Sequence, residues 1–165
     1  ESIQASDNWI FFIRLNSINK QLDISNITVT EHHTKGQTTE KQYAATEQSS
    51  LIELLQIFLH AKAHDYHLKN SKVKLTVVLT CWDELETKEK PRRVLEEHLP
   101  LLLNFIESNW LTDKLNFIGL SALQFPLSPE NKVKYETEGS ENFGFIINAN
   151  GDKTKDITEL ISESV

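Results

Sequence analysis

The sequence predicts an α/β fold in three layers, with a mainly parallel sheet and helices on both faces. Three segments are apolar along nearly their whole length instead of alternating: Asn8–Leu15, Val73–Thr80 and Leu115–Ser121. Such runs are typical of parallel strands that are covered on both faces. Helical patterns separate these segments along the chain, and strands that alternate with helices favour a parallel sheet.

Two long helical patterns lie between the predicted strands. The first covers Gln48–Lys69, with Ser49 or Ser50 available as its N-cap. The second covers Pro91–Trp110 and opens with a proline, which suits the first turn of a helix. Pro100 lies inside the second pattern, and we expect it to kink or split the helix because proline lacks the amide hydrogen that the helix needs.

Weaker patterns fill the rest of the chain. They predict an extended segment at Asp23–Glu31, a polar loop at His32–Gln48, a polar connection at 126–141, a short fourth strand at Phe143–Asn148, a turn at Asn150-Gly151 and a final helix at Lys155–Ser164. Together the elements predict one α/β domain, or a fragment of one, over residues 1–165.

Composition narrows the class of protein. The 165 residues are enough for one domain with a buried core. The net charge of −7 argues against a nucleic acid or an anionic membrane as the main partner. No apolar run has the length of a membrane span, and the single cysteine fits a reducing compartment, so we expect a cytoplasmic protein. The chain contains no methionine, and we expect it to be a piece of a longer protein.

Two strand ends carry the candidate site. The second apolar segment ends in Thr80-Cys81-Trp82-Asp83, and the third ends in Ser121 followed by Ala122. In open parallel sheets, ligands bind beyond the carboxyl ends of the strands. An acidic residue at such an end is therefore a candidate for binding chemistry.

These strand ends resemble a pair of motifs in Ras-like P-loop GTPases. In that family the fifth strand ends in Asn-Lys-x-Asp and the sixth in Ser-Ala-x, with a helix between them. Val77–Leu85 (VVLTCWDEL) and Phe117–Leu123 (FIGLSAL) match in order, spacing and strand context. TCWDEL looks closest to bacterial double-GTPase-like proteins of the translation-factor-related class. The resemblance covers nearly the whole chain as the second half of such a domain, a partial Ras-like P-loop GTPase fold.

The resemblance implies a site for GTP or GDP. Asp83 takes the place of the aspartate that reads guanine, and a carboxylate suits the two N–H donors on one edge of that base. Ala122 would offer its backbone N–H to the guanine O6, Ser121 would brace the loop, and Leu123 completes the Ser-Ala-x motif. Thr80 and Cys81 stand at the asparagine and lysine positions, and loss of the lysine stem weakens nucleotide binding.

The phosphate-binding motifs of those GTPases do not occur in the sequence. None of the five glycines belongs to a G-x-x-x-x-G-K-[ST] loop, and there is no Asp-x-x-Gly. Such a loop holds the β- and γ-phosphates and supplies a hydroxyl ligand to Mg²⁺. We therefore predict the guanine-nucleotide-binding part of a GTPase-like protein, with Mg²⁺ binding and GTP hydrolysis only if a P-loop lies upstream in the parent protein.

Two other functions stay open. The missing lysine and phosphate motifs also suit a nucleotide-free pseudo-GTPase that acts as a scaffold or protein-interaction module, with a protein partner that the sequence does not identify. An unrelated doubly wound enzyme could also place its site at Asp83 and Ser121, because one fold hosts many chemistries.

Each of these residues also has a structural explanation. Asp83 would then be a helix N-cap or a loop carboxylate, Cys81 a small buried hydrophobe and Trp82 a plug at the end of the core. The pair Arg92-Arg93 begins a helix, where positive charge opposes the helix dipole. We expect it to form an ion pair with Glu89 or Glu96.

Three histidines recur along the first predicted helix: His60, His64 and His67. With about 100° per residue they share the side opposite the apolar face, beside Glu53. Imidazoles at this spacing can capture zinc or nickel. This face of the helix is open to solvent and lacks surrounding groups that would orient the imidazoles. We therefore expect no physiological metal there.

Overall fold

A computed structural model describes residues 2–18, 47–125, 128–139 and 142–164. Within them the sheet has five strands in the spatial order β1 (Asn8–Ile13), β2 (Lys74–Thr80), β3 (Leu115–Ser121), β4 (Phe145–Ile147) and β5 (Lys153–Thr154). β1, β2 and β3 are parallel, whereas β4 and β5 pair antiparallel with their neighbours. The predicted mainly parallel sheet is confirmed.

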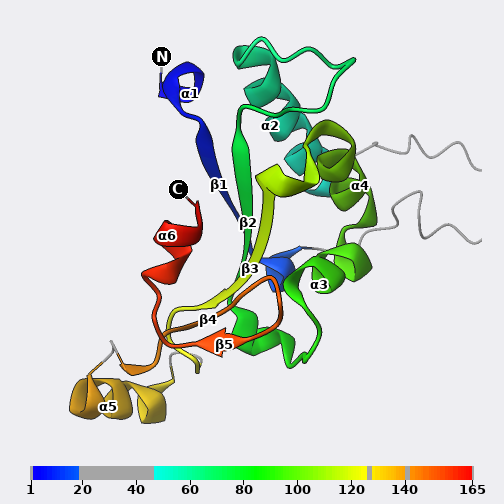
Figure 1. The fold of residues 1–165 in the computed structure, drawn as a ribbon. Helices are drawn as coiled ribbons and strands as arrows, with labels where there is room; N and C mark the ends of the chain where they lie inside the picture. Colours follow the sequence, from blue (N-terminus) through cyan, green and yellow to red (C-terminus); the bar gives the residue numbers. More distant parts are fainter. Residues whose placement is uncertain (1, 19–46, 126–127, 140–141, 165) are drawn as a thin grey trace, which may run out of the picture.

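The helices lie on both sides of this sheet. They are α1 (Ser2–Ala5), α2 (Glu47–Ala61), α3 (Pro91–His98), α4 (Pro100–Asn109), α5 (Pro129–Glu138) and α6 (Glu159–Ser164). In Figure 1, α2, α3 and α4 stand on one side of β1–β3 and α6 stands on the other. The α/β architecture predicted from the sequence is therefore confirmed.

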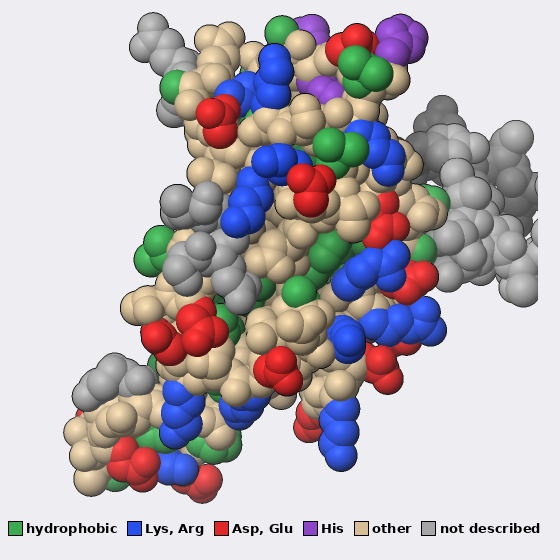
Figure 2. All heavy atoms as spheres, in the orientation of Figure 1, with side chains coloured by type: hydrophobic (Ala, Val, Ile, Leu, Met, Phe, Trp, Pro, Cys, Tyr) green, Lys and Arg blue, Asp and Glu red, His purple; other side chains and the backbone are tan. Residues whose placement is uncertain are grey.

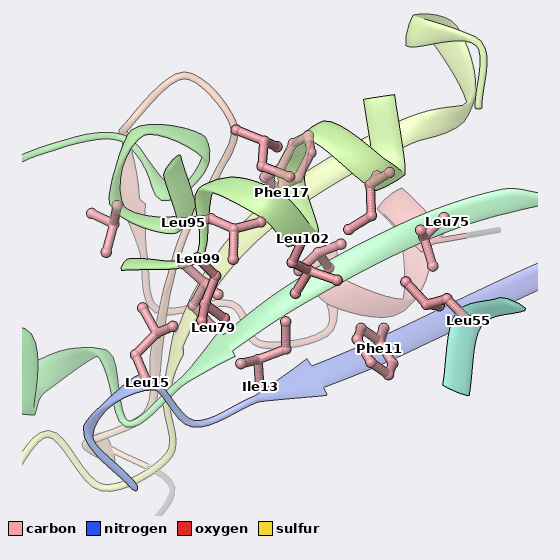
Figure 3. Close-up of a cluster of buried hydrophobic side chains, with 14 of the residues drawn as sticks. Phe11, Ile13, Leu15, Leu55, Leu75, Leu79, Leu95, Leu99, Leu102 and Phe117 are labelled. Carbon is pink, nitrogen blue, oxygen red and sulfur yellow. The ribbon is translucent and has the colours of Figure 1, made fainter. Parts of the chain in front are cut away.

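The larger core fills the face under α2, α3 and α4. Phe11 and Ile13 of β1 meet Leu75 and Leu79 of β2, and Leu102 of α4 packs over them (Figure 3). Side chains of a strand alternate between faces, so their neighbours along β2 point to the other side of the sheet. β2 is buried along five successive residues, as its mainly apolar sequence predicts.

A smaller core lies under α6. It contains Val78 of β2, Ile118 of β3, Ile146 of β4 and Leu160 of α6. This face is incompletely covered at β1, where Ile10 is 40% exposed and Phe12 is 54% exposed. In the described residues β1 pairs only with β2, so one edge of the strand is open.

The split predicted at Pro100 is confirmed. α3 ends at His98, Leu99 leaves the helical conformation with φ −136° and ψ 62°, and α4 starts at Pro100. The first amides of α4 find an acceptor elsewhere in the chain. Gln48 Oε1 accepts from the amides of Leu101 and Leu102, at 2.9 and 3.1 Å. This buried glutamine of α2 therefore caps α4 in place of a local N-cap.

The helix predicted at Gln48–Lys69 is too long. α2 ends at Ala61, because Ala63 adopts a left-handed conformation with φ 52°. The amide of Ala63 donates to His60 O at 2.9 Å and that of His64 to Leu59 O at 3.0 Å, which is a Schellman motif. Glycine usually occupies the left-handed position, so an alanine there left no stop signal in the sequence.

Near the carboxyl terminus two further predictions are corrected and one strand was missed. The connection predicted at 126–141 contains α5, whose Ser128 Oγ accepts from the amide of Asn131 at 3.2 Å. Tyr135 is its one buried residue among those described, so α5 shows no apolar periodicity. β5 was not predicted, and the final helix begins at Glu159 instead of Lys155.

The predictions for 19–46 lie outside the described residues. They are the extended segment Asp23–Glu31 and most of the polar loop His32–Gln48. The last two residues of that predicted loop, Glu47 and Gln48, belong to α2. The predicted turn at Asn150-Gly151 is confirmed, with Gly151 at φ 93° and its amide donating to Asn148 O at 2.9 Å.

Candidate functional site

The two strand ends chosen from the sequence meet in space. β2 and β3 are adjacent and parallel, and Thr80 pairs with Leu120 in their register. Beyond these ends, Ser121 Oγ donates a hydrogen bond of 2.5 Å to Asp83 Oδ1 across 38 positions of sequence. Ser121 is fully buried and Asp83 is half-buried, so the contact lies at the boundary between core and solvent.

A short 3₁₀ helix, Trp82–Leu85, sets the position of the carboxylate. Trp82 turns into the core with 5% exposure, where it packs against the backbone of Gly119. A side chain at position 119 would overlap the indole ring, so the absence of one at Gly119 leaves the space that the ring fills. With Trp82 pointing inward, the next residue, Asp83, faces the end of β3.

The turn into this 3₁₀ helix is strained. Cys81 has φ 54° and ψ 44°, a left-handed conformation that costs a non-glycine residue free energy. Thr80 Oγ1 donates to Ile13 O at 3.3 Å, which ties the turn to the end of β1. Cys81 is a half-buried free thiol, more exposed than its structural explanation as a small buried hydrophobe implies.

The second loop follows β3 and is folded on Ser121. The amide of Gln124 donates to Ser121 Oγ at 2.9 Å, so the hydroxyl accepts from its own loop while it donates to Asp83. Gln124 adopts φ 65°, which reverses the chain after Leu123. Ala122 is exposed at the tip, and Leu123 is half-buried behind it.

A third segment reaches the site, which sequence reasoning missed. Arg14 Nη2 donates to Glu84 Oε1 at 2.7 Å, and Asn16 Nδ2 donates to Glu84 O at 3.2 Å. These bonds join the loop after β1 to the loop after β2. Glu84, next to Asp83, and Arg14, at the end of the first strand, are both visible in the sequence. Their pairing could not be predicted, because it depends on β1 and β2 being parallel neighbours in the sheet.

The structural explanation of Asp83 as an N-cap is wrong. The N-cap of Trp82–Leu85 is Cys81, and no side chain caps that helix. Asp83 Oδ1 takes its bond from Ser121, and among the described residues Oδ2 has no hydrogen-bond partner. A carboxylate offers about four lone-pair sites, so this one retains the capacity to accept from two adjacent N–H groups. That is the donor pattern of a guanine edge.

Comparison with protein families decides the family. The model of the family described as Double-GTPase 1 matches residues 1–164. The chain belongs to the Double-GTPase 1 family. The match confirms the resemblance to double-GTPase-like proteins inferred from the two strand ends. No curated protein and no solved structure matches the chain.

Other features of this Double-GTPase 1 member lie away from the strand ends. The ion pair predicted for Arg92-Arg93 is confirmed, with Glu96 Oε2 at 3.6 Å from Arg92 Nη1 and 3.0 Å from Arg93 Nη1. On the face shown in Figure 2, acidic and basic side chains are interspersed. Among the described residues no helix is both long and apolar enough to cross a membrane.

The three histidines do not share one helix. His60 is the last-turn residue of α2, whereas His64 and His67 lie beyond its end. His60 and His67 are exposed, but Nε2 of His64 is buried and has no hydrogen-bond partner among the residues that the structure describes. Within the described part of the chain, no three His, Cys, Asp or Glu side chains form a group that could hold a metal ion.

A cavity of about 220 Å³ lies at the other end of the sheet, lined by residues 62–65 and 68–73. Two of its lysines are already engaged: Lys62 Nζ lies 2.9 Å from Asp7 Oδ1 and Lys69 Nζ lies 2.6 Å from Glu107 O. The cavity adjoins the start of β2 and shares no residue with the strand ends that carry Asp83.

Proposed function

We propose that this chain is the guanine-nucleotide-binding part of a GTPase-like protein, with Asp83 as the residue that reads the base. The hydrogen bond between Asp83 and Ser121 at the carboxyl ends of adjacent parallel strands carries the proposal. Membership of the Double-GTPase 1 family supports it independently. The proposal includes a cytoplasmic protein of bacterial origin, as the resemblance and the single cysteine suggest.

The proposed binding geometry uses both oxygens of Asp83. Guanine presents N1–H and N2–H side by side, and a carboxylate accepts from both in a charge-assisted pair. Adenine presents an acceptor at N1, which the carboxylate would repel. Ser121 holds Oδ1 in place, so the carboxylate loses little rotational freedom when the base binds.

The remaining site residues have supporting roles in the proposal. The exposed Ala122 offers its backbone N–H to the guanine O6, and Leu123 follows it in the same loop. Thr80 holds the first loop to β1 through its bond to Ile13 O. Cys81, at the lysine position, contributes less contact with the base than a lysine stem would. Mg²⁺ and hydrolysis belong to the proposal only if the parent protein carries a P-loop upstream.

Calorimetric titration of the full-length protein with GDP, and with ADP as the competitor base, tests the proposal. Wild type should prefer GDP, and Asp83→Asn should lose that preference because an amide supplies one acceptor and no charge. Asp113→Asn is the matched control, since it removes an exposed acid from the Thr112–Lys114 turn before β3. Equal binding of GDP and ADP by wild type would refute base reading by Asp83.

A nucleotide-free scaffold is the second candidate, and the open edge of β1 favours it. Among the described residues β1 has no strand partner on this edge, where Ile10 and Phe12 expose apolar surface. Another strand can extend an edge of this kind. A protein partner retained by Asp83→Asn and lost from Phe12→Asp, with no nucleotide bound to wild type, would support this function. If the Phe12→Asp variant still bound the partner, the edge of β1 would not be the interaction surface.

A further inference from the structure

α5 contacts the candidate site through a single side chain. Of its described residues only Tyr135 is buried, with 8% exposure. In Figure 1 the helix lies apart from α2, α3 and α4, at the end of the sheet where β3 leaves. Because α5 adds so little to the core, Tyr135 is a candidate for a role outside core packing.

The hydroxyl of Tyr135 holds the loop after β3. It lies 2.9 Å from Leu123 O and 2.6 Å from Phe125 O, so one proton is shared between two carbonyls. The two acceptors flank Gln124, whose left-handed backbone makes the reversal of the loop. On the other side of the same reversal, the amide of Gln124 donates to Ser121 Oγ. The loop is therefore fastened at both sides of its tip.

Aromatic packing holds the tyrosine ring. Its centroid lies 4.9 Å from that of Phe143, with the ring planes at 90°. Phe125 approaches the same Phe143 ring at 6.3 Å, and Lys134 Nζ lies 4.7 Å above the Phe125 ring. Edge-to-face contacts of this kind stabilise a defined ring orientation. The hydroxyl is thus presented to the loop from a fixed position.

We infer that Tyr135 is a positioning residue for base recognition: by anchoring the carbonyls on both sides of Gln124, it sets the backbone N–H of Ala122 that reads the guanine O6. The inference rests on the proposed function and adds to it a residue outside both strand-end motifs. Asp83 reads the N–H edge of the base and is held by Ser121, whereas the Tyr135 hydroxyl bonds to the loop that carries the O6 contact.

Two analogues of GDP separate these contacts. 6-Thio-GDP keeps both N–H donors but replaces O6 with sulfur, a weak acceptor, and IDP keeps O6 but lacks the 2-amino group. Tyr135→Phe should weaken GDP binding by the full-length protein about five-fold, the worth of one ordinary hydrogen bond. The preference for GDP over 6-thio-GDP should fall with it, and the preference for GDP over IDP should not change.

Thr137→Ala is the matched control on the same helix. Its hydroxyl donates to Val133 O at 2.8 Å on the exposed side of α5, so its loss leaves the loop untouched. Tyr135→Phe keeps the ring contacts, and far-UV circular dichroism checks that it is folded. An unchanged preference over 6-thio-GDP would overturn the inference, and so would equal falls in both preferences. A wild type without GDP binding would overturn the proposed function and the inference together, which distinguishes the two failures.

Discussion

Replacing Gly119 by alanine is expected to destabilise the fold at the point where it supports Asp83. Gly119 lies in the middle of β3 and faces the Trp82 ring. An added Cβ would sit 2.5 Å from Cδ2 and 3.0 Å from Cζ3 of that ring. Trp82 is 5% exposed, so the ring has no solvent into which it can move.

The magnitude follows from two opposing terms. Inserting a methyl group into a packed core costs about 1–3 kcal/mol. Alanine is also less flexible than glycine in the unfolded chain, which returns about 0.5–1 kcal/mol. The steric cost should exceed the gain from the unfolded chain, because the rigid indole of Trp82 occupies the space that the added methyl group needs. We therefore expect the free energy of unfolding to fall by about 1–2 kcal/mol. The melting temperature should fall by roughly 2–8 °C.

Urea denaturation followed by far-UV circular dichroism measures this change. Gly144→Ala is the matched control, because its Cβ would meet the flexible end of Ile157, which is 38% exposed and can rotate away. It should change stability by less than about 0.5 kcal/mol. In the double variant Gly119→Ala, Trp82→Leu, the smaller side chain should relieve the overlap. The loss of unfolding free energy in the double variant should therefore be smaller than the sum of the losses in the two single variants.

A Gly119→Ala protein as stable as wild type would contradict this prediction, because the Trp82 ring would then have room beside position 119. The same variant should also weaken GDP binding. Trp82 and Asp83 are consecutive in one 3₁₀ helix, so a displaced ring carries the carboxylate away from Ser121. Loss of stability with full GDP affinity would mean that the ring does not position Asp83.

Two further predictions concern helix ends. Gln48→Leu should lower the free energy of unfolding by about 1–2 kcal/mol, because it removes the acceptor of one part-buried and one buried amide at the start of α4. Gln56→Leu, at an exposed position of α2, should be near neutral in the same urea titration. The Thr158 hydroxyl and then its amide, at 2.5 and 3.0 Å, hold the pKa of Asp156 below its usual value. The stability that this contributes is present above about pH 4 and is lost as the pH falls through the lowered pKa. Asp156→Asn keeps an acceptor but does not titrate, so its unfolding free energy should fall less steeply below that pH; an unchanged slope would contradict this assignment.

Much of the fold could be predicted because it depends on local pattern. The apolar runs predict β1, β2 and β3 as parallel strands, although β1 leaves Ile10 and Phe12 exposed on one face. Pro100 predicts the split between α3 and α4. The errors occur where the pattern is silent. Ala63 ends α2 in a conformation that usually takes glycine, and α5 buries only Tyr135, so neither feature left a periodic signal.

The amino-acid pattern was enough to locate the three parallel strands and the residues that end them, because burial selects apolar residues within a strand and leaves polar ones at its end. It therefore placed Asp83 and Ser121 at the carboxyl edge of a parallel sheet. The folded structure was needed to show that these two side chains bond to each other, that Glu84 joins Arg14, and that a tyrosine on α5 anchors the second loop. These bonds join residues 38, 70 and 10 positions apart, and they depend on which strands become neighbours and how the loops pack. No local period of the sequence records that choice.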